Sequence, residues 1–290
     1  MLLKDIEPFT RQVVISTLSS NIKNDVYKEL RASDCRLFYI LNGNGTMKIE
    51  NKDYPLHQGC AILVKSGTKY VWQLDEKGVT AIFVNFDFTM NFSSITASFH
   101  PVHSEHFSES DILEKIDFED AKILNSPIYI KNATSLEANL KLLASEYYLK
   151  SNYAQEYLSS CLKFVIISLA KLAELTETDE KKKNYETVRK VIQYIENNYR
   201  HELSNEIIGE YFHFNPSYLN RIFKENTGDT LHNFLVRYRI SLAMELLHTT
   251  ILPVNEIATT VGFSDIPHFI KSFKKATGKT PGDYRNKIKK

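Results

Sequence analysis

The sequence predicts an α+β protein of two domains: a β-rich N-terminal domain that ends in a helical pair, and an all-helical C-terminal domain. Two observations in the 290 residues predict this division. Between residues 10 and 90, short runs rich in Val, Ile, Phe and Tyr are separated by Gly, Asn and Asp, which is typical of an antiparallel sandwich or barrel. From residue 135 onward, apolar residues recur at helical spacing instead.

Each apolar run of the N-terminal part predicts a strand. The runs are RLFYIL (36–41), TMKIE (46–50), CAILVK (60–65), KYVWQL (69–74) and TAIFVNFDF (80–88). The segments between them are rich in residues that favour turns, as in NGNG at 42–45. Residues 91–130 have no clear period, so we expect irregular structure with short elements there.

Two helices are expected next, at 136–149 and 156–174. The second carries an apolar stripe that consists of Leu158, Leu162, Val165 and Leu169. Such a stripe mostly packs within its own domain, but its place beside a linker makes it a candidate dimer seam, and we assign these residues to dimerisation. The polar run TETDEKKKN (176–184) predicts that linker, so the expected domains are 1–175 and 185–290.

Charge is divided unevenly between the two parts. Residues 185–290 carry 15 Lys and Arg against 11 Asp and Glu, a net charge of +4, whereas residues 1–184 carry 21 against 24, a net charge of −3. A basic C-terminal domain favours a nucleic-acid partner there. The three cysteines are far apart, and the N-terminus has no apolar signal segment. We therefore expect a cytoplasmic protein with no disulfide framework, no zinc ribbon and no membrane partner.

The C-terminal domain repeats itself at an offset of 50 residues. Phe223, Lys224, Thr227, Gly228 and Thr230 match Phe273, Lys274, Thr277, Gly278 and Thr280. A repeat at fixed spacing indicates a duplicated supersecondary unit.

Each copy predicts a helix, a tight turn and a second helix. In the first copy, Ser204 is the expected N-cap of a helix that ends near Tyr211, and Asn215 caps a second helix that Gly228 ends. In the second copy, a helix at 256–261 precedes one that Ser264 is expected to cap. Helix, turn, helix is the motif whose second helix enters a DNA major groove. The segment between the copies, residues 231–247, spans roughly 25 Å as a helix, which suits two recognition helices in successive grooves.

Helical spacing assigns an outward face to each second helix. With Leu219 and Phe269 facing inward, the outward positions are Ser217, Arg221 and Lys224 in the first copy and Pro267, Lys271 and Lys274 in the second. Arg221 suits a guanine edge and Asn220, on the flank, suits adenine. Lys224, Lys274 and Lys275 suit phosphates. An exposed basic residue is most often merely solvated, so the repeated pattern carries the prediction rather than any single lysine.

Four segments carry a resemblance to a known family: RIFKENTG (221–228), RISLAMELL (239–247), EIATTVGFSD (256–265) and FIKSFKKATGKTPGDYR (269–285). Over about residues 185–290 the chain resembles the paired helix-turn-helix domain of AraC-type bacterial transcription regulators. The resemblance implies binding to a double-stranded DNA operator, a functional link to RNA polymerase, and base contacts by Ser217, Asn220, Arg221, Pro267 and Lys271. Pro267 departs from the polar residue common at its place, so the neighbouring His268 and Ile270 join the candidates, with Ile270 suited to a thymine methyl.

A second resemblance lies in GCAILVKSGTKYVW (59–72), which is similar to the cupin half-motif G-x5-P-x-G-x2-H and extends over about residues 20–90. Lys65 replaces the proline and Tyr70 replaces the metal-binding histidine. The resemblance implies a small sensor barrel and argues against a metal-dependent cupin enzyme. His100, His103 and His106 are the only metal-like cluster; a solvated loop is the favoured interpretation, so no metal and no other cofactor is expected.

The interior of that barrel is the expected site for a small-molecule effector. Tyr70 and Trp72 share a strand face, as do Phe83 and Asn85. Aromatic rings that stack and also hydrogen-bond suit a sugar. Arg36, at a strand start, is expected either to contact the ligand or to cap the barrel, and Phe83 is favoured slightly more as core.

The sequence thus predicts a dimeric, ligand-responsive transcription regulator that is not an enzyme. Two alternatives stay open. One is a cupin-type enzyme fused to a DNA-tethering module, which metal analysis of the purified protein would distinguish. The other is an effector-free DNA binder with a structural barrel, which calorimetry against candidate sugars would distinguish.

Overall fold

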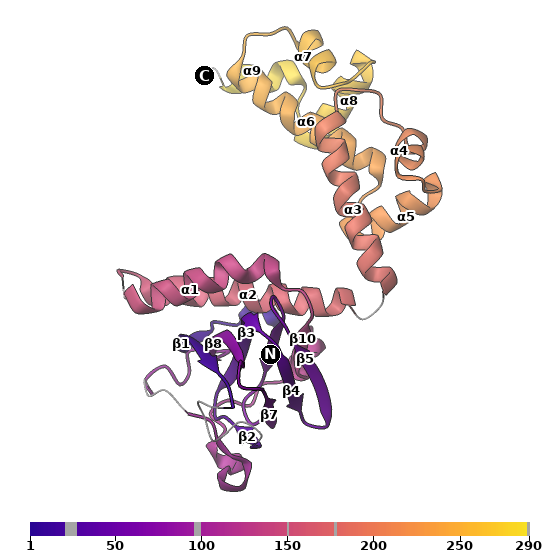
Figure 1. Ribbon diagram of the computed structural model, residues 1–290. Helices are drawn as coiled ribbons and strands as arrows, with labels where there is room; N and C mark the ends of the chain where they lie inside the picture. The colour runs from indigo at the N-terminus through magenta and orange to yellow at the C-terminus, as the bar shows by residue number, and fades with distance from the viewer. Residues whose placement is uncertain (21–27, 96–99, 150, 177–178, 289–290) are drawn as a thin grey trace. The chain divides into compact units, whose positions relative to one another are not determined.

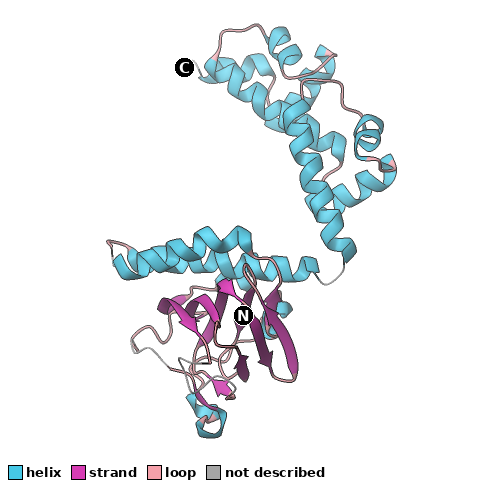
Figure 2. Ribbon diagram, viewed as in Figure 1, coloured by secondary structure: helices cyan, strands magenta, loops and turns pink. Residues whose placement is uncertain are grey.

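The computed structural model describes residues 1–290 except 21–27, 96–99, 150, 177–178 and 289–290, and it divides into two compact units, Met1–Glu177 and Thr178–Lys290. The assigned strands all lie in the first unit, and the second unit is helical (Figures 1 and 2). The two-domain α+β class is confirmed. Within the described part of the chain, no helix combines the length and the apolar character that crossing a membrane requires.

The first unit contains two five-stranded antiparallel sheets. The first sheet has the order β1 (Phe9–Leu18), β8 (Val79–Asp87), β3 (Cys35–Gly43), β6 (Ala61–Val64) and β10 (Ile128–Ile130). The second has the order β5 (Lys52–Leu56), β4 (Gly45–Ile49), β7 (Tyr70–Gln73), β2 (Leu30–Arg31) and β9 (Val102–His103). The predicted strands are present with bounds shifted by one or two residues, and β1, β2, β5, β9 and β10 are additional.

The first sheet is buried on both faces, which explains its long apolar runs. Along β3, Leu37 and Tyr39 belong to the core shared with α1 (Glu137–Leu149) and α2 (Ala154–Thr176), whereas Phe38 and Ile40 belong to the core shared with the second sheet. The two helices lie across the outer face of the first sheet (Figure 1). The layers are therefore a helical pair, the first sheet and the second sheet.

The four residues predicted to form a dimer seam lie in the core instead. Leu158, Leu162, Val165 and Leu169 are at most 5% exposed and pack with the first sheet. That prediction is wrong, because the outer face of the first sheet covers the stripe and leaves no surface for a second chain. The other side of α2 exposes a different apolar set, which includes Tyr157, Phe164 and Ile167.

The polar run at 176–184 is helical wherever the structure describes it, so the predicted linker is corrected. α2 ends at Thr176 and α3 spans Asp179–Asn198. Lys and Glu are good helix formers, so a charged run before an amphipathic segment readily extends the helix toward its N-terminus. Asn184 belongs to the second unit, because its Oδ1 accepts a hydrogen bond from the Tyr218 hydroxyl at 3.0 Å.

The second unit contains the predicted duplicated helix pairs. The first copy consists of α4 (Asn205–Phe212) and α5 (Pro216–Thr227), and the second of α7 (Val254–Thr260) and α8 (Ile266–Thr277). α6 (Leu231–Thr249) follows the first copy, and α9 (Pro281–Ile288) follows the second. Gly228 and Gly278 end the second helix of each copy with φ of 78° and 76°.

The helix caps agree with the sequence in the first copy and differ in the second. Ser204 and Asn215 accept hydrogen bonds from the backbone N–H groups of their own first turns. Asp265, rather than the predicted Ser264, caps α8, and its Oδ2 accepts from the His268 N–H at 2.9 Å. Asp265 lies 50 residues after Asn215, so the repeat itself marks the correct cap.

α6 joins the two copies, because its first half packs in the core of the first copy and its second half in the core of the second. Arg239, buried between these halves, donates from Nε to the Tyr199 carbonyl and from Nη2 to the His201 carbonyl, both at 2.8 Å. Its guanidinium also lies over the ring of Phe263 at 5.7 Å. One side chain therefore fastens the α3–α4 connection of the first copy to the α7–α8 turn of the second.

Gly262 in that α7–α8 turn should not tolerate a side chain. It has φ of +94°, and an added Cβ would lie 2.5 Å from the Tyr199 carbonyl oxygen and 3.0 Å from Arg239 Nε. We expect Gly262→Ala to lower the free energy of unfolding by about 1–3 kcal/mol through backbone strain alone, measured by urea denaturation followed by circular dichroism. Gly282→Ala is the control, because no described atom lies within 4 Å of its added Cβ and alanine favours a helix. Equal destabilisation by both substitutions would contradict this account of the turn.

Candidate functional site

A cavity of about 280 Å³ lies between the two sheets of the first unit. Its wall is formed by residues of β1, β2, β3, β7 and β8 together with His100 and Pro101: Gln12, Val14, Ser16, Leu18, Leu30, Arg36, Phe38, Tyr70, Trp72, Phe83 and Asn85. All five predicted effector-binding residues (Arg36, Tyr70, Trp72, Phe83 and Asn85) are in this wall. The structure brings them together, and what they bind stays a prediction.

Aromatic rings form one part of the wall. The ring of Phe38 lies edge-on to those of Tyr70, Trp72 and Phe83, with centroid distances of 5.7, 5.2 and 5.7 Å. Trp72 is 4% exposed and belongs to the core between the sheets. The same rings therefore hold the two sheets together and offer apolar surface to the cavity.

Asn85, in the cavity wall, has one polar side-chain atom that is hydrogen-bonded and one that is not, among the residues that the structure describes. Its Nδ2 donates to Gln12 Oε1 at 3.0 Å. Its Oδ1 is buried and accepts no hydrogen bond from the residues that the structure describes. An unsatisfied buried acceptor costs about 1–3 kcal/mol, so a donor group at this oxygen would stabilise the folded state.

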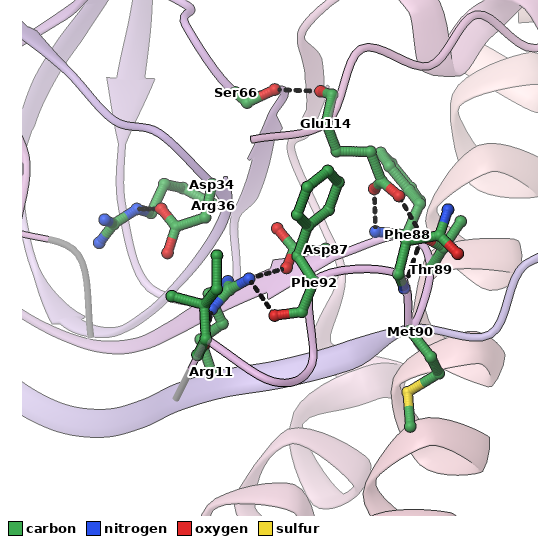
Figure 3. Close-up of polar contacts among 12 residues, drawn as sticks. Arg11, Asp34, Arg36, Ser66, Asp87, Phe88, Thr89, Met90, Phe92 and Glu114 are labelled. Carbon is green, nitrogen blue, oxygen red and sulfur yellow. Dashed lines mark hydrogen bonds and ion pairs between the residues drawn. The ribbon is translucent and has the colours of Figure 1, made fainter. Parts of the chain in front are cut away.

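Buried ion pairs lie beside the Arg36 part of the wall (Figure 3). Arg36 Nε contacts Asp34 Oδ1 at 2.7 Å, and Arg11 Nη2 contacts Asp87 Oδ2 at 2.5 Å. Burial raises the pKa of Asp34 to about 6, although the guanidinium of Arg36 opposes the shift. Asp34 is therefore mainly ionised at neutral pH, and it compensates the charge that Arg36 brings to the cavity.

The segment after β8 is held by two buried side chains, those of Glu114 and Arg11. Glu114 accepts hydrogen bonds from the Phe88 N–H at 2.8 Å and from the Thr89 hydroxyl. Arg11 donates to the carbonyl oxygens of Phe92 and Ile95. These contacts fix the chain where it leaves the first sheet (Figure 3).

Sequence reasoning missed the contribution of β1 to the cavity. Gln12, Val14, Ser16 and Leu18 alternate with a period of two, which is the signal that would have placed them on one strand face. Phe38 carries the same signal, two residues after Arg36. The ion pair of Arg11 with Asp87 and the hydrogen bonds of Glu114 have no comparable signal, because they join residues that are distant in sequence.

The histidine cluster is dispersed over different elements. His100 lines the cavity, His103 ends β9, and His106 lies in the next turn, 3.4 Å from Glu105. Among the described residues, no group of three or more His, Cys, Asp and Glu is placed to hold a metal ion.

The second helix of each copy presents the predicted outward face. Leu219, Phe223, Phe269 and Phe273 are buried, whereas the candidates Ser217, Arg221, Lys224, Pro267, His268, Ile270, Lys271 and Lys274 are exposed. Arg221 pairs with Glu225 at 2.8 Å and lies over the Tyr218 ring at 5.1 Å. Beside α8, a groove of about 440 Å³ against α6 has a mixed lining that includes Lys271, Lys275 and the ion pair of Arg237 with Asp229.

Asn220 differs from the other candidates. It is half-buried, and its Oδ1 accepts a hydrogen bond at 3.0 Å from the N–H of Leu231, the first residue of α6. Bidentate recognition of adenine needs this oxygen. The predicted base contact therefore competes with the hydrogen bond that Asn220 accepts from the Leu231 N–H. In the second copy, Ile270 and Pro281 occupy the equivalent positions, and proline has no N–H to satisfy.

The duplicated helix pairs define the class of the second unit. Residues 208–287 match a family profile described as "Helix-turn-helix domain". This match confirms the helix-turn-helix domain that the sequence motifs predicted, and the resemblance to AraC-type regulators lies in this unit.

Curated relatives resemble this chain over parts of their length. The chain is 34% identical over 112 residues to the bifunctional transcriptional activator/DNA repair enzyme AdaA of Bacillus subtilis, which covers 39% of this chain and 53% of that protein. It is 32% identical over 117 residues to the Msm operon regulatory protein of Streptococcus mutans, covering 40% and 41%. It is 27% identical over 125 residues to the xylose operon regulatory protein of Escherichia coli, covering 43% and 32%. The chain thus spans about half or less of these relatives.

A solved structure is also similar. The C-terminal domain of AraT, a response regulator from Geobacillus stearothermophilus, is 36% identical and covers 35% of this chain and 84% of that chain, with a TM-score of 0.34.

Proposed function

We propose that the chain is a DNA-binding transcription regulator that is not an enzyme, and that a small molecule bound in the N-terminal cavity controls its action on RNA polymerase. The observation that carries this proposal is the duplicated helix pair, in which α5 and α8 both turn basic side chains outward. The net charge of +4 over residues 185–290 supports the same partner, because phosphate neutralisation dominates affinity for DNA.

The two outward faces suit different parts of the operator. Lys224 and Lys274 suit phosphates, and the Arg221 guanidinium suits the O6 and N7 acceptors of a guanine. The ion pair of Arg221 with Glu225 is exposed and of the i, i+4 kind, which is typically worth about 0.3–0.5 kcal/mol. A bidentate guanine contact discriminates by about 1–3 kcal/mol, which is more than the ion pair contributes. Arg221 can therefore give up its contact with Glu225 and bind the base.

The effector we propose is a neutral sugar. A cavity of about 280 Å³ suits a molecule of monosaccharide size, the aromatic wall suits the C–H face of a sugar ring, and Asn85 Oδ1 suits a hydroxyl donor. The pairing of Arg36 with Asp34 disfavours an anion, because the guanidinium charge is already compensated. The xylose operon regulatory protein among the relatives makes pentoses the first compounds to test.

The cavity disfavours the two alternatives. Tyr70 stands where a cupin would place its metal-binding histidine, and burial raises the pKa of Tyr70 to about 12. A neutral phenol is a poor metal ligand, which argues against a metal-dependent enzyme. In an effector-free structural barrel, the buried amide oxygen of Asn85 would stay without a donor. Buried polar groups are usually hydrogen-bonded, so this oxygen favours a barrel that binds a ligand.

We also propose that the protein is a homodimer through the outward face of α2. Tyr157, Phe164 and Ile167 are 42%, 52% and 37% exposed on one helix, and a second copy of the same face would bury them. This replaces the seam assigned from the sequence, whose residues are buried in the domain core.

The DNA face can be tested by two substitutions. Arg221→Ala should weaken operator binding by roughly 1–3 kcal/mol and relax the preference at one base pair. Lys274→Ala should weaken binding to all sequences and reduce the slope of log affinity against log salt by about one. Titrations of labelled duplexes by fluorescence anisotropy measure both effects. Unchanged affinity and preference in Arg221→Ala would refute this orientation of α5.

The effector site can be tested by a substitution at Asn85. Trp72 is less suitable, because it is part of the core and its truncation would destabilise the first unit. Asn85→Leu keeps the side-chain size but removes the acceptor, so it should lower sugar affinity at least tenfold, on the scale of one lost hydrogen bond to a buried group. Quenching of Trp72 fluorescence, with calorimetry against a panel of pentoses and hexoses, measures binding. Met47→Leu lies in the same core but outside the cavity wall and should bind as the unsubstituted protein does. Equal affinities in all three proteins would place the effector elsewhere.

The dimer can be tested on the two faces of α2. Phe164→Asp should convert the dimer to a folded monomer in sedimentation equilibrium, because a charge on the proposed interface opposes association. Leu162→Asp should unfold the first unit instead, because Leu162 is fully buried. A Phe164→Asp protein that keeps its dimeric mass would remove this face from the interface.

A further inference from the structure

The two recognition helices, α5 and α8, carry different residues at one equivalent flanking position, Asn220 in α5 and Ile270 in α8, and only Asn220 bonds to the next helix in the described structure. In α5, the Asn220 side chain satisfies the first N–H of α6. In α8, the equivalent residue is Ile270, and the helix that follows begins with Pro281, which has no N–H. The packing of the second copy therefore demands no polar atom at position 270, and Ile270 is 37% exposed.

The N-terminal turn of α8 is apolar and exposed. Ile266 is 37% exposed, and Pro267 is exposed at the position where the first copy has Ser217. The ring of Pro267 also removes one backbone donor from the helix end. The only hydrogen bond that caps this end in the described structure runs from the His268 N–H to Asp265. The acidic Asp265 makes this end a poor phosphate site, since its charge already occupies the positive end of the helix dipole.

Three lysines follow this apolar turn along α8. Lys271 and Lys274 lie one and two turns further along the outward face, and Lys275 joins the groove against α6. An apolar exposed turn followed by lysines has the pattern of a surface that enters DNA, with phosphates neutralised beside it and the tip meeting base edges. In the major groove, the one apolar group on a base edge is the C5 methyl of thymine.

We propose that Pro267 and Ile270 read thymine methyl groups, so that the second half of the operator is specified by apolar contact whereas the first half is specified by hydrogen bonds from Arg221. This inference rests on the proposed DNA-binding function and assigns the chemistry of one half-site. It identifies Pro267 and Ile270 as specificity-determining residues, with Lys271 and Lys274 supplying affinity from the backbone.

The experiment replaces thymine by deoxyuridine, which removes the methyl and leaves the hydrogen-bonding edge intact. A duplex is first selected from a random library with the full-length protein, and each thymine is then replaced in turn. Burial of one methyl is worth about 0.8 kcal/mol, which corresponds to roughly a fourfold change in affinity. We expect such a loss at one or two positions of the α8 half-site, with replacements in the α5 half-site as the internal comparison.

The chain provides its own matched variants, because the first copy holds polar residues at the same two places. Pro267→Ser and Ile270→Asn install the residues of the first copy, and circular dichroism reports whether the helix persists. In the folded double variant, the affinities for thymine and uracil duplexes should become equal. Ile270→Val keeps the apolar surface and should keep the preference for thymine.

Two results would overturn the proposal. One is a selected duplex in which no uracil replacement in the α8 half-site changes affinity as much as twofold, while Arg221→Ala still weakens binding. The other is a larger loss from 7-deazaguanine, which lacks the N7 acceptor, than from uracil in that half-site, because Lys271 would then be the reader. Failure to select any duplex would instead refute the proposed DNA-binding function, so the two failures are distinguishable.

Discussion

The hydrogen bonds of Arg239 are the constraint on which the arrangement of the second unit depends. Each helix-turn-helix copy has its own core, and α6 and the junction at Arg239 join one copy to the other. A guanidinium suits this place, because it reaches two carbonyl oxygens and an aromatic face at once. DNA offers its grooves at a fixed helical repeat, so a shift at this junction would misplace one recognition helix whenever the other is seated.

The first unit is organised by a sheet that is buried on both faces. One face of β3 packs against α1 and α2, and the other helps to form both the inter-sheet core and the cavity wall. Trp72 and Phe38 therefore belong both to the core between the sheets and to the wall of the cavity in which we propose that the ligand binds. A molecule that binds only the folded state raises the free energy of unfolding by mass action. Occupancy of this cavity would therefore stabilise the whole first unit and not just the residues that line the cavity.

The parts that the sequence predicts well are those fixed by local chemistry. Strands β3, β4, β6, β7 and β8, the caps Ser204 and Asn215, and the outward faces of α5 and α8 follow from alternation, capping and helical period. The apolar stripe that includes Leu162 was visible as a stripe, but periodicity does not say whether a sheet or a second chain covers it. The contacts of Arg11 with Asp87 and of Glu114 with Phe88 depend on how distant strands meet. No local pattern encodes them.

The different duties of Asn220 and Ile270 have a consequence for how such a protein acquires new targets. A substitution at position 220 removes the hydrogen bond to the start of α6 and also changes any contact with DNA. Such a substitution therefore affects folding and recognition at the same time. A substitution at position 270 removes no hydrogen bond to the next helix, because Pro281 has no N–H, and it would act on the proposed contact with DNA. In the proposed regulator, the second copy is therefore the one in which a single substitution at this position can change operator preference without removing a hydrogen bond from the start of the following helix.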